Sequence, residues 1–222
     1  MDAAALKTLD FIHRNLAAWR DDPERNPVER ERDLNSQLCK YLNVVARNGG
    51  FAMVHFHHEE PQGSQHSADI SASLLDVNWI EGRQYTKYDP ILLLEGKRLP
   101  TPGSGRQREY IASPAGDPPM GGIQRFKLGL HGAAISIAGI VGYIQAENCP
   151  HWFDEVNRWI DDLVSAPASE WSSHDRFYTF HHDPALRVSR CESGHSRISG
   201  VSQSVRLTHL WVEMSLRSPV SR

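Results

Sequence analysis

Paired cysteines are missing from this sequence. Its 222 residues include three cysteines, Cys39, Cys149 and Cys191, which lie far apart and form no CxxC pair. An odd number of isolated cysteines argues against a disulfide framework and against a zinc ribbon.

A long uninterrupted hydrophobic run is also missing. The most apolar stretch, residues 133–144, is too short and too interrupted by glycine to span a bilayer. The first residues, MDAAALKTLDFIHRNL, lack a charged start followed by an apolar run, so we expect no signal peptide. These absences favour a cytoplasmic enzyme or binding domain that has no membrane partner.

The sequence has no excess of positive charge. It contains 24 Lys and Arg against 27 Asp and Glu, which gives a formal net charge of -3. Proteins that bind nucleic acid are often basic, so this balance counts mildly against a large DNA footprint. A local basic cleft on a neutral body remains compatible with it.

The apolar residues that are present predict alternating helices and strands. They share one helical face over residues 3–20 and again over 28–46, where Pro27 suits the first turn of the second helix. The further elements that we expect, in chain order, are strands over 51–57 and 68–75, an irregular hairpin over 78–87, a continuous apolar strand over 91–95, a short helix over 122–130, a buried element over 133–145, a helix over 150–164 and a polar, β-like tail over 177–216.

This order predicts one α/β domain built around a mixed central β-sheet flanked by helices. Its core is expected at about residues 28–146, after a helical extension over 1–27. Residues 147–222 would add a C-terminal segment of one helix and several strands. The last of these strands, VRLTHLWVEM, is expected at the edge of the sheet or next to it.

Acidic and basic residues on two predicted strands carry the strongest chemical signal. Asp69 lies on one strand, and Glu95-Gly96-Lys97 ends the next, where alternation points Glu95 and Lys97 to the same side. Hydrolysis of a phosphodiester needs a cation, and Mg²⁺ prefers oxygen ligands. Asp69, Glu95 and the Gly96 carbonyl could supply these ligands. Lys97 could orient the attacking water or stabilise the charge that develops on the phosphate.

A further acid precedes these strands on the second predicted helix. Glu31 lies three residues before Leu34, which places it near the border of the apolar face, so its carboxylate could reach inward. Glu29 and Asp33 point further from that face and are expected in solvent.

The order of a helical Glu31, a strand Asp69 and a strand Glu95-x-Lys97 resembles the PD-(D/E)xK restriction-endonuclease-like superfamily. The resemblance implies a restriction-endonuclease-like fold and a nuclease that depends on Mg²⁺ or Mn²⁺. It makes Asp69 and Glu95 metal ligands, Lys97 the catalytic lysine and Glu31 an auxiliary acid. It also implies a nucleic-acid partner, DNA before RNA, and a homodimer by family analogy. The interval between Asp69 and Glu95 is longer than in compact members of the superfamily, so the predicted hairpin would be an excursion from the sheet.

A second resemblance covers more of the chain. The strings EGKRLP, REYI, GGIQRF and AGIVGYIQ are similar to a set of uncharacterised bacterial restriction-endonuclease-like proteins, some found near defence genes. In the superfamily, the helix after the lysine strand often supplies a side chain near the phosphate, which suggests Gln124, Arg125 and Lys127, with Arg98 beside the motif. Arg125 could hold phosphate bidentately or serve as a structural ion-pair residue.

Other readings remain open. A nuclease-like fold without catalysis could act as a nucleic-acid-binding or protein-interaction module. The histidines at 55–58 and 181–182 invite a zinc site, but no third and fourth ligands follow at diagnostic spacing. Residues 193–197 and His209 are expected on an exposed sheet face, and the tryptophans at 152, 159 and 171 in the core or at an interface.

Overall fold

The computed structural model describes residues 2–62, 66–80, 82–103, 105–114, 116–167, 169–199 and 202–214. Its helices are α1 (Asp2–Arg20), α2 (Glu31–Asn48), α3 (Gly122–Lys127), α4 (Cys149–Val164) and the short 3-10 helix η1 (Ser173–Asp175). Its strands are β1 (Val54–Gln62), β2 (His66–Leu74), β3 (Asn78–Ile80), β4 (Arg83–Tyr85), β5 (Pro90–Leu99), β6 (Ile137–Ile144), β7 (Tyr178–Asp183), β8 (Val188–Ser196) and β9 (Ser204–Glu213).

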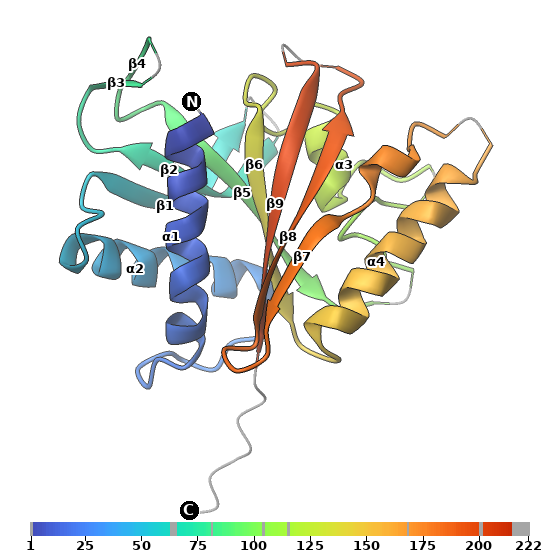
Figure 1. Ribbon diagram of the computed structural model, residues 1–222, viewed down its shortest axis with the longest axis horizontal. Coiled ribbons are helices and arrows are strands. Elements are labelled where there is room, and N and C mark those ends of the chain that lie inside the picture. Colours follow the sequence, from blue (N-terminus) through green and yellow to red (C-terminus); the bar gives the residue numbers. More distant parts are fainter. Residues whose placement is uncertain are drawn as a thin grey trace, which may run out of the picture.

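A seven-stranded mixed sheet forms the centre of the molecule, in the order β1-β2-β5-β6-β9-β8-β7. The three central strands β5, β6 and β9 are parallel, whereas the pairs on either side of them are antiparallel. Helices lie on both sides of this sheet (Figure 1). The predicted α/β fold with a mixed central sheet is confirmed.

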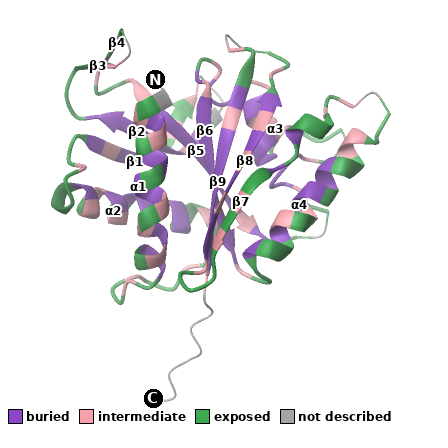
Figure 2. Ribbon diagram, in the orientation of Figure 1, coloured by how far each residue is buried: buried purple, intermediate pink, exposed green. Residues whose placement is uncertain are grey.

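Each face of the sheet has its own hydrophobic core. Apolar residues of α1 and α2 pack on one face, and those of α3 and α4 pack on the other. Every residue of β6 is buried, and Figure 2 shows the central strands buried along most of their length. A strand covered on both sides has no polar face, which explains why this part of the sequence reads as a continuous apolar run.

The short strands β3 and β4 form a separate two-stranded sheet between β2 and β5. This is the hairpin predicted over residues 78–87. It accounts for the long interval between Asp69 and Glu95, because the chain leaves the central sheet after β2 and returns to it at β5.

Several predicted boundaries are wrong. Helix α2 begins at Glu31 and not at residue 28, and the strands β1 and β2 extend well into the expected loop over 59–67, of which 63–65 lie outside the described residues. Strand β5 continues to Leu99, so Glu95-Gly96-Lys97 lies inside a strand and not at its end. The errors in the strands share a cause, since polar residues that pair with one another inside a sheet look like loop residues in the sequence.

The C-terminal strand β9 was predicted at or near the sheet edge, which is also wrong. It lies between β6 and β8, and most of its residues are buried. Helix α1 likewise packs on the centre of the sheet, through residues such as Leu9 and Leu16. Residues on both sides of the expected 28–146 core are therefore part of the packed structure, α1 as a helix on the sheet and β7, β8 and β9 as strands within it.

The cysteines Cys39, Cys149 and Cys191 are all buried and free. Among the residues that the structure describes, no helix has both the length and the apolar character needed to cross a membrane.

Candidate active site

The predicted catalytic residues meet where strands β2 and β5 separate. Strand β2 pairs with β1 along its whole length but with β5 only from Ile70, which lies opposite Leu94, onward. At the preceding residue, Asp69, the side chain replaces the main chain as the partner of β5, and Asp69 Oδ2 accepts the N–H of Gly96 at 2.8 Å. A side chain thus fills the gap between the two strands.

A pocket with a volume of about 290 Å³ opens at this position. The residues that line it come from α2, β2, β5, α3 and the loop between β5 and α3, and they are Glu31, Ser67, Asp69, Lys97, Arg106, Glu109, Met120 and Arg125. Three of the four residues predicted to be catalytic therefore share one pocket. The fourth, Glu95, is fully buried behind it.

Lys97 joins two of the predicted acids. Its Nζ lies 3.0 Å from Glu31 Oε1 and 3.1 Å from Glu95 Oε1. The other oxygen of Glu31 accepts the backbone N–H of Arg98 at 3.1 Å. Glu31 therefore reaches inward as predicted, although it does so from the first residue of α2.

Glu95 is surrounded by cationic and imidazole groups. Arg125 Nη1 lies 2.7 Å from its Oε1, and His131 Nδ1 lies 3.2 Å from its Oε2. Burial alone would raise the pKa of Glu95, but Lys97, His131 and Arg125 hold it at about 2. Burial likewise opposes the charge of Lys97, yet the neighbouring carboxylates raise its pKa well above its usual range. This part of the cluster is locked in its ionised form.

Asp69 is in the opposite situation. Burial raises its pKa to about 7, and repulsion from Glu95 adds to this effect. Lys97 and the Gly96 N–H favour the charged form but do not compensate fully. Asp69 is therefore the carboxyl of the cluster that gains most from an added cation or proton.

Gly96 is required by close packing. A Cβ atom at this position would lie 2.0 Å from Asn35 Oδ1. Asn35 is buried on α2, and the same Oδ1 accepts a hydrogen bond from the Tyr143 hydroxyl at 2.7 Å. The glycine between Glu95 and Lys97 lets α2 approach β5 closely enough for Glu31 to reach Lys97.

The four residues predicted to bind nucleic acid are not gathered in one place. Arg125 lines the pocket and pairs with Glu95, so it is an ion-pair residue, and its binding of phosphate stays a prediction. Gln124 Oε1 accepts the N–H of Ser113 at 3.1 Å and holds the preceding loop. Arg98 donates from Nη1 to a main-chain oxygen, that of Glu29, at 3.1 Å.

Lys127 was predicted to lie where it could contact a phosphate of bound nucleic acid, beside the pocket that contains Lys97. This placement is wrong. Its ammonium is buried, with Nζ at 2.9 Å and 3.1 Å from the two carboxylate oxygens of Asp175 and at 5.0 Å from the centre of the Trp171 ring. A helix turns about 100° per residue, so Lys127 points away from the side on which Arg125 lies. The sequence spacing contained this information, but not the identity of the partner.

Sequence reasoning missed part of the pocket wall. Arg106 and Glu109 form a two-bond ion pair, at 2.5 Å and 2.6 Å, in the loop that leads to α3. The side chain of Arg106 is mostly exposed, and Arg106 lines the pocket together with Glu109. Residues 100–119 are rich in Pro, Gly and Ser, as surface loops are, but nothing in this composition distinguishes Arg106 from other surface arginines.

The donor atoms suit a hard cation by type, because Asp69, Glu95 and the Gly96 carbonyl all offer oxygen. The undercompensated Asp69 carboxylate is the observation that supports such an ion. In the part of the chain that the structure describes, however, Glu31, Asp69 and Glu95 do not form a set of three ligand atoms within 4.8 Å of one another. The Lys97 ammonium contacts both Glu31 and Glu95, so a metal would have to compete with it.

The expectation that Ser193, His195 and His209 lie on an exposed face is wrong. Ser193 Oγ lies 2.7 Å from Nε2 of both His195 and His209, and all three residues are buried. These contacts extend to Tyr110, whose hydroxyl is 2.9 Å from His209, and to Asp175, which is 2.5 Å from His195 and also pairs with Lys127. Alternation along β8 and β9 shows which residues share a face, but only the position of α4 and η1 determines that this face is covered.

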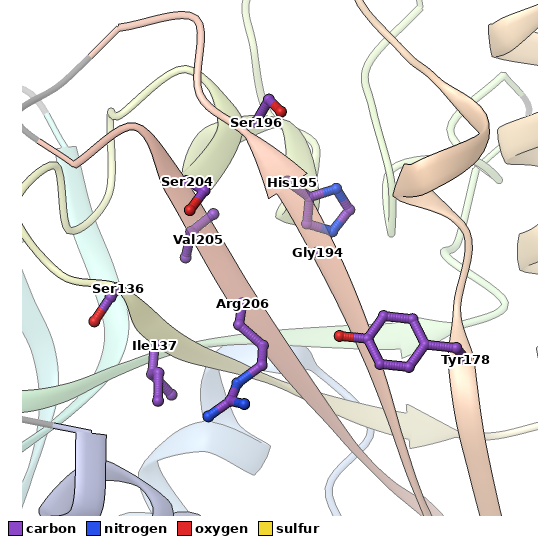
Figure 3. Close-up of a pocket in the computed structure, with 9 residues that line it drawn as sticks. All are labelled: Ser136, Ile137, Tyr178, Gly194, His195, Ser196, Ser204, Val205 and Arg206. Carbon is purple, nitrogen blue, oxygen red and sulfur yellow. The ribbon is translucent and has the colours of Figure 1, made fainter.

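A different pocket, with a volume of about 360 Å³, lies where β6 and β9 begin (Figure 3). In Figure 3, the Tyr178 hydroxyl points toward β8, and the Arg206 side chain lies to the left of Tyr178, on β9. The residues that line this pocket are Ser136, Ile137, Tyr178, Gly194, His195, Ser196, Ser204, Val205 and Arg206. None of them is a carboxylate, so this pocket suits metal-assisted hydrolysis less well than the one that contains Lys97.

Comparisons of the chain with protein-family models, with curated proteins and with solved structures give no match.

Proposed function

We propose that this protein is a metal-dependent nuclease of the PD-(D/E)xK type that hydrolyses phosphodiester bonds, in DNA before RNA. The observation that carries the proposal is the sharing of Lys97 between Glu31 and Glu95 beside a pocket that also contains Asp69. The sequence motif required that these four residues come together from one helix and two strands, and they do so.

The side chains of the pocket have complementary roles in this proposal. Lys97 is held at one position by two carboxylates, so its ammonium needs no reorganisation to stabilise charge on a phosphate. Arg125 and Arg106 bring two guanidinium groups to the same pocket, and a guanidinium matches the geometry of phosphate oxygens. Asp69, Glu95 and the Gly96 carbonyl would hold Mg²⁺ or Mn²⁺, which supplies Lewis acidity and a more acidic water.

The proposal is tested by assaying cleavage of single- and double-stranded DNA and of RNA, with Mg²⁺, with Mn²⁺ and with chelator. Asp69→Asn and Lys97→Met should each lower the cleavage rate by more than about 100-fold, as loss of one charge-stabilising group commonly does. The exposed residues Asp76 and Lys87 provide matched controls, because Asp76→Asn and Lys87→Met make the same chemical changes away from the pocket. Metal-dependent cleavage that survives both pocket variants would rule out this site.

A second function is favoured by one observation. Glu95 already pairs with the Lys97 ammonium and the Arg125 guanidinium, so this buried carboxylate has cationic partners without a metal. A nuclease-like module that binds nucleic acid or protein without cleaving would need no more than this. It predicts no binding of Mg²⁺ or Mn²⁺ in calorimetry and no cleavage by the folded wild type, with binding to nucleic acid or to a protein partner as its positive result.

We further propose a physiological role in bacterial defence, which rests on the resemblance of the sequence strings alone. Protection of a host strain against phage infection is the assay for it, with the Lys97→Met variant as the control that keeps the protein but removes the proposed chemistry.

A further inference from the structure

Three potential metal ligands converge at the end of the sheet away from β3 and β4. Cys149 is the first residue of α4, His182 lies on the edge strand β7, and Glu213 is the last residue of β9. One ligand atom from each lies within 4.8 Å of the other two. In Figure 1, α4 begins and β6, β7 and β9 end at this lower end of the sheet. No other such group of three or more His, Cys, Asp or Glu ligands is found among the described residues.

Two of the three ligands are held in place by further contacts. Glu213 Oε1 accepts the backbone N–H of Cys149 at 2.9 Å, and its Oε2 lies 3.1 Å from Nε of Arg187. His182 pairs with Ser189 across β7 and β8, and Ser189 Oγ lies 2.8 Å from its Nδ1. Partners of this kind orient metal ligands in proteins, because they fix the imidazole tautomer and the direction of the carboxylate.

The chemistry of these groups differs from that of the Lys97 pocket. One sulfur, one nitrogen and one oxygen donor suit a borderline cation such as Zn²⁺, whereas Mg²⁺ prefers oxygen alone. A Cys149 thiolate and the Glu213 carboxylate together would carry two negative charges, beside the one positive charge of Arg187. His182 is only half-buried, and a zinc site with three protein ligands takes a water as its fourth ligand.

We propose that Cys149, His182 and Glu213 form a Zn²⁺ site that is separate from the Lys97 pocket. Binding breaks the S–H bond of Cys149, forms a Zn–S bond and releases one proton to solvent, with no change of oxidation state. The ion links helix α4, the edge strand β7 and the central strand β9, so it stabilises the C-terminal part of the sheet. This site does not depend on the proposed nuclease function.

Metal titration of the full-length, chelator-treated protein tests the site. We expect one tightly bound Zn²⁺ per chain, and a Co²⁺ adduct that shows a thiolate-to-metal charge-transfer band in the near ultraviolet. Zn²⁺ should also raise the melting temperature, because it binds the folded chain in preference to the unfolded one.

Matched variants identify the ligands. His182→Ala should weaken Zn²⁺ binding by more than about tenfold. Loss of a residue that merely orients a metal ligand already weakens binding by about that factor, and loss of a ligand should weaken it more. His181→Ala should not, since neighbouring residues of a strand point to opposite faces and His181 is exposed. Cys149→Ser should remove the Co²⁺ charge-transfer band, whereas Cys39→Ser, at a buried cysteine on α2, should keep it.

Three results would overturn the proposal. They are the absence of stoichiometric Zn²⁺ binding, equal Zn²⁺ affinity of His182→Ala and wild type, and a Co²⁺ adduct without a thiolate band. Loss of binding in His55→Ala instead would place the ion at the His55–His57 pair, whose ring centres are 4.6 Å apart. If Cys149→Ser does not fold, the Zn²⁺ affinity of His182→Ala still tests the proposal, because His182 is half-buried on an edge strand and its replacement should leave the fold intact.

Discussion

At the scale of single residues, Asp69 and Glu95 are two carboxylates that share one cluster but differ in charge state. Glu95 contacts Lys97, Arg125 and His131, which hold its pKa at about 2. Asp69 contacts the N–H of Gly96, and burial together with Glu95 raises its pKa to about 7. The difference in pKa arises from the partners of each side chain, because Glu95 contacts three groups that favour its charged form and Asp69 has fewer such contacts.

The raised pKa of Asp69 predicts how the stability of the protein changes with pH. The folded chain binds a proton at Asp69 that the unfolded chain has already lost above pH 4, so this group makes the free energy of unfolding fall as pH rises from about 4 to about 7. Asp69→Asn removes this contribution. The free energy of unfolding of the wild type relative to the variant should therefore fall by up to roughly 4 kcal/mol across this range. Urea unfolding at several pH values measures it, and a difference that is constant with pH would contradict it.

At the scale of secondary-structure elements, the contact between α2 and β5 builds the site. Glu31 and Asn35 are four positions apart. Because both lie in α2, which begins at Glu31, they are on the same side of the helix and face β5. Glu31 reaches Lys97, and Asn35 lies against Gly96. The helix thus contributes one acid and sets its distance from the strand through a single glycine.

Gly96→Ala should therefore disturb the site and the fold together. The added methyl group would lie 2.0 Å from Asn35 Oδ1, and α2 or Asn35 must move away. We expect a loss of about 1–3 kcal/mol in the free energy of unfolding, as overpacking of a core commonly produces. Gly194→Ala on β8 is the matched control, because the nearest atom to its Cβ would be the Tyr178 hydroxyl at 4.0 Å. Equal unfolding free energies for the two variants would contradict this account of the helix–strand contact.

At the scale of the whole molecule, the sheet depends on segments that are distant in the chain. Strand β9 pairs in parallel with β6, and the chain between them passes through α4, β7 and β8. Helix α1 covers the same central strands from the other face. The pocket that contains Lys97 therefore lies in a sheet whose interior is completed by the N-terminal helix and the C-terminal strands.

A fragment of residues 28–146 should not fold by itself. It lacks β9 beside β6 and lacks α1 on the opposite face, so fully buried strands would lose their neighbours and expose apolar surface to water. We expect no cooperative thermal transition in circular dichroism and rapid amide hydrogen exchange in β5 and β6. A cooperative transition would show that residues 28–146 fold independently, which would contradict the dependence on α1 and β9.

The local pattern of the sequence determined which residues can act together, and the tertiary structure decided which of them do. Alternation along a strand places Glu95 and Lys97 on one side wherever that strand lies, and apolar runs mark the strands that are covered on both faces, because both properties depend on near neighbours in the chain. The partner of Lys127, the central position of β9 and the meeting of Cys149, His182 and Glu213 depend on strand order and on packing between segments that are far apart in sequence. The periodicity of apolar residues along single helices and strands does not contain that information, so these features became visible only in the folded molecule.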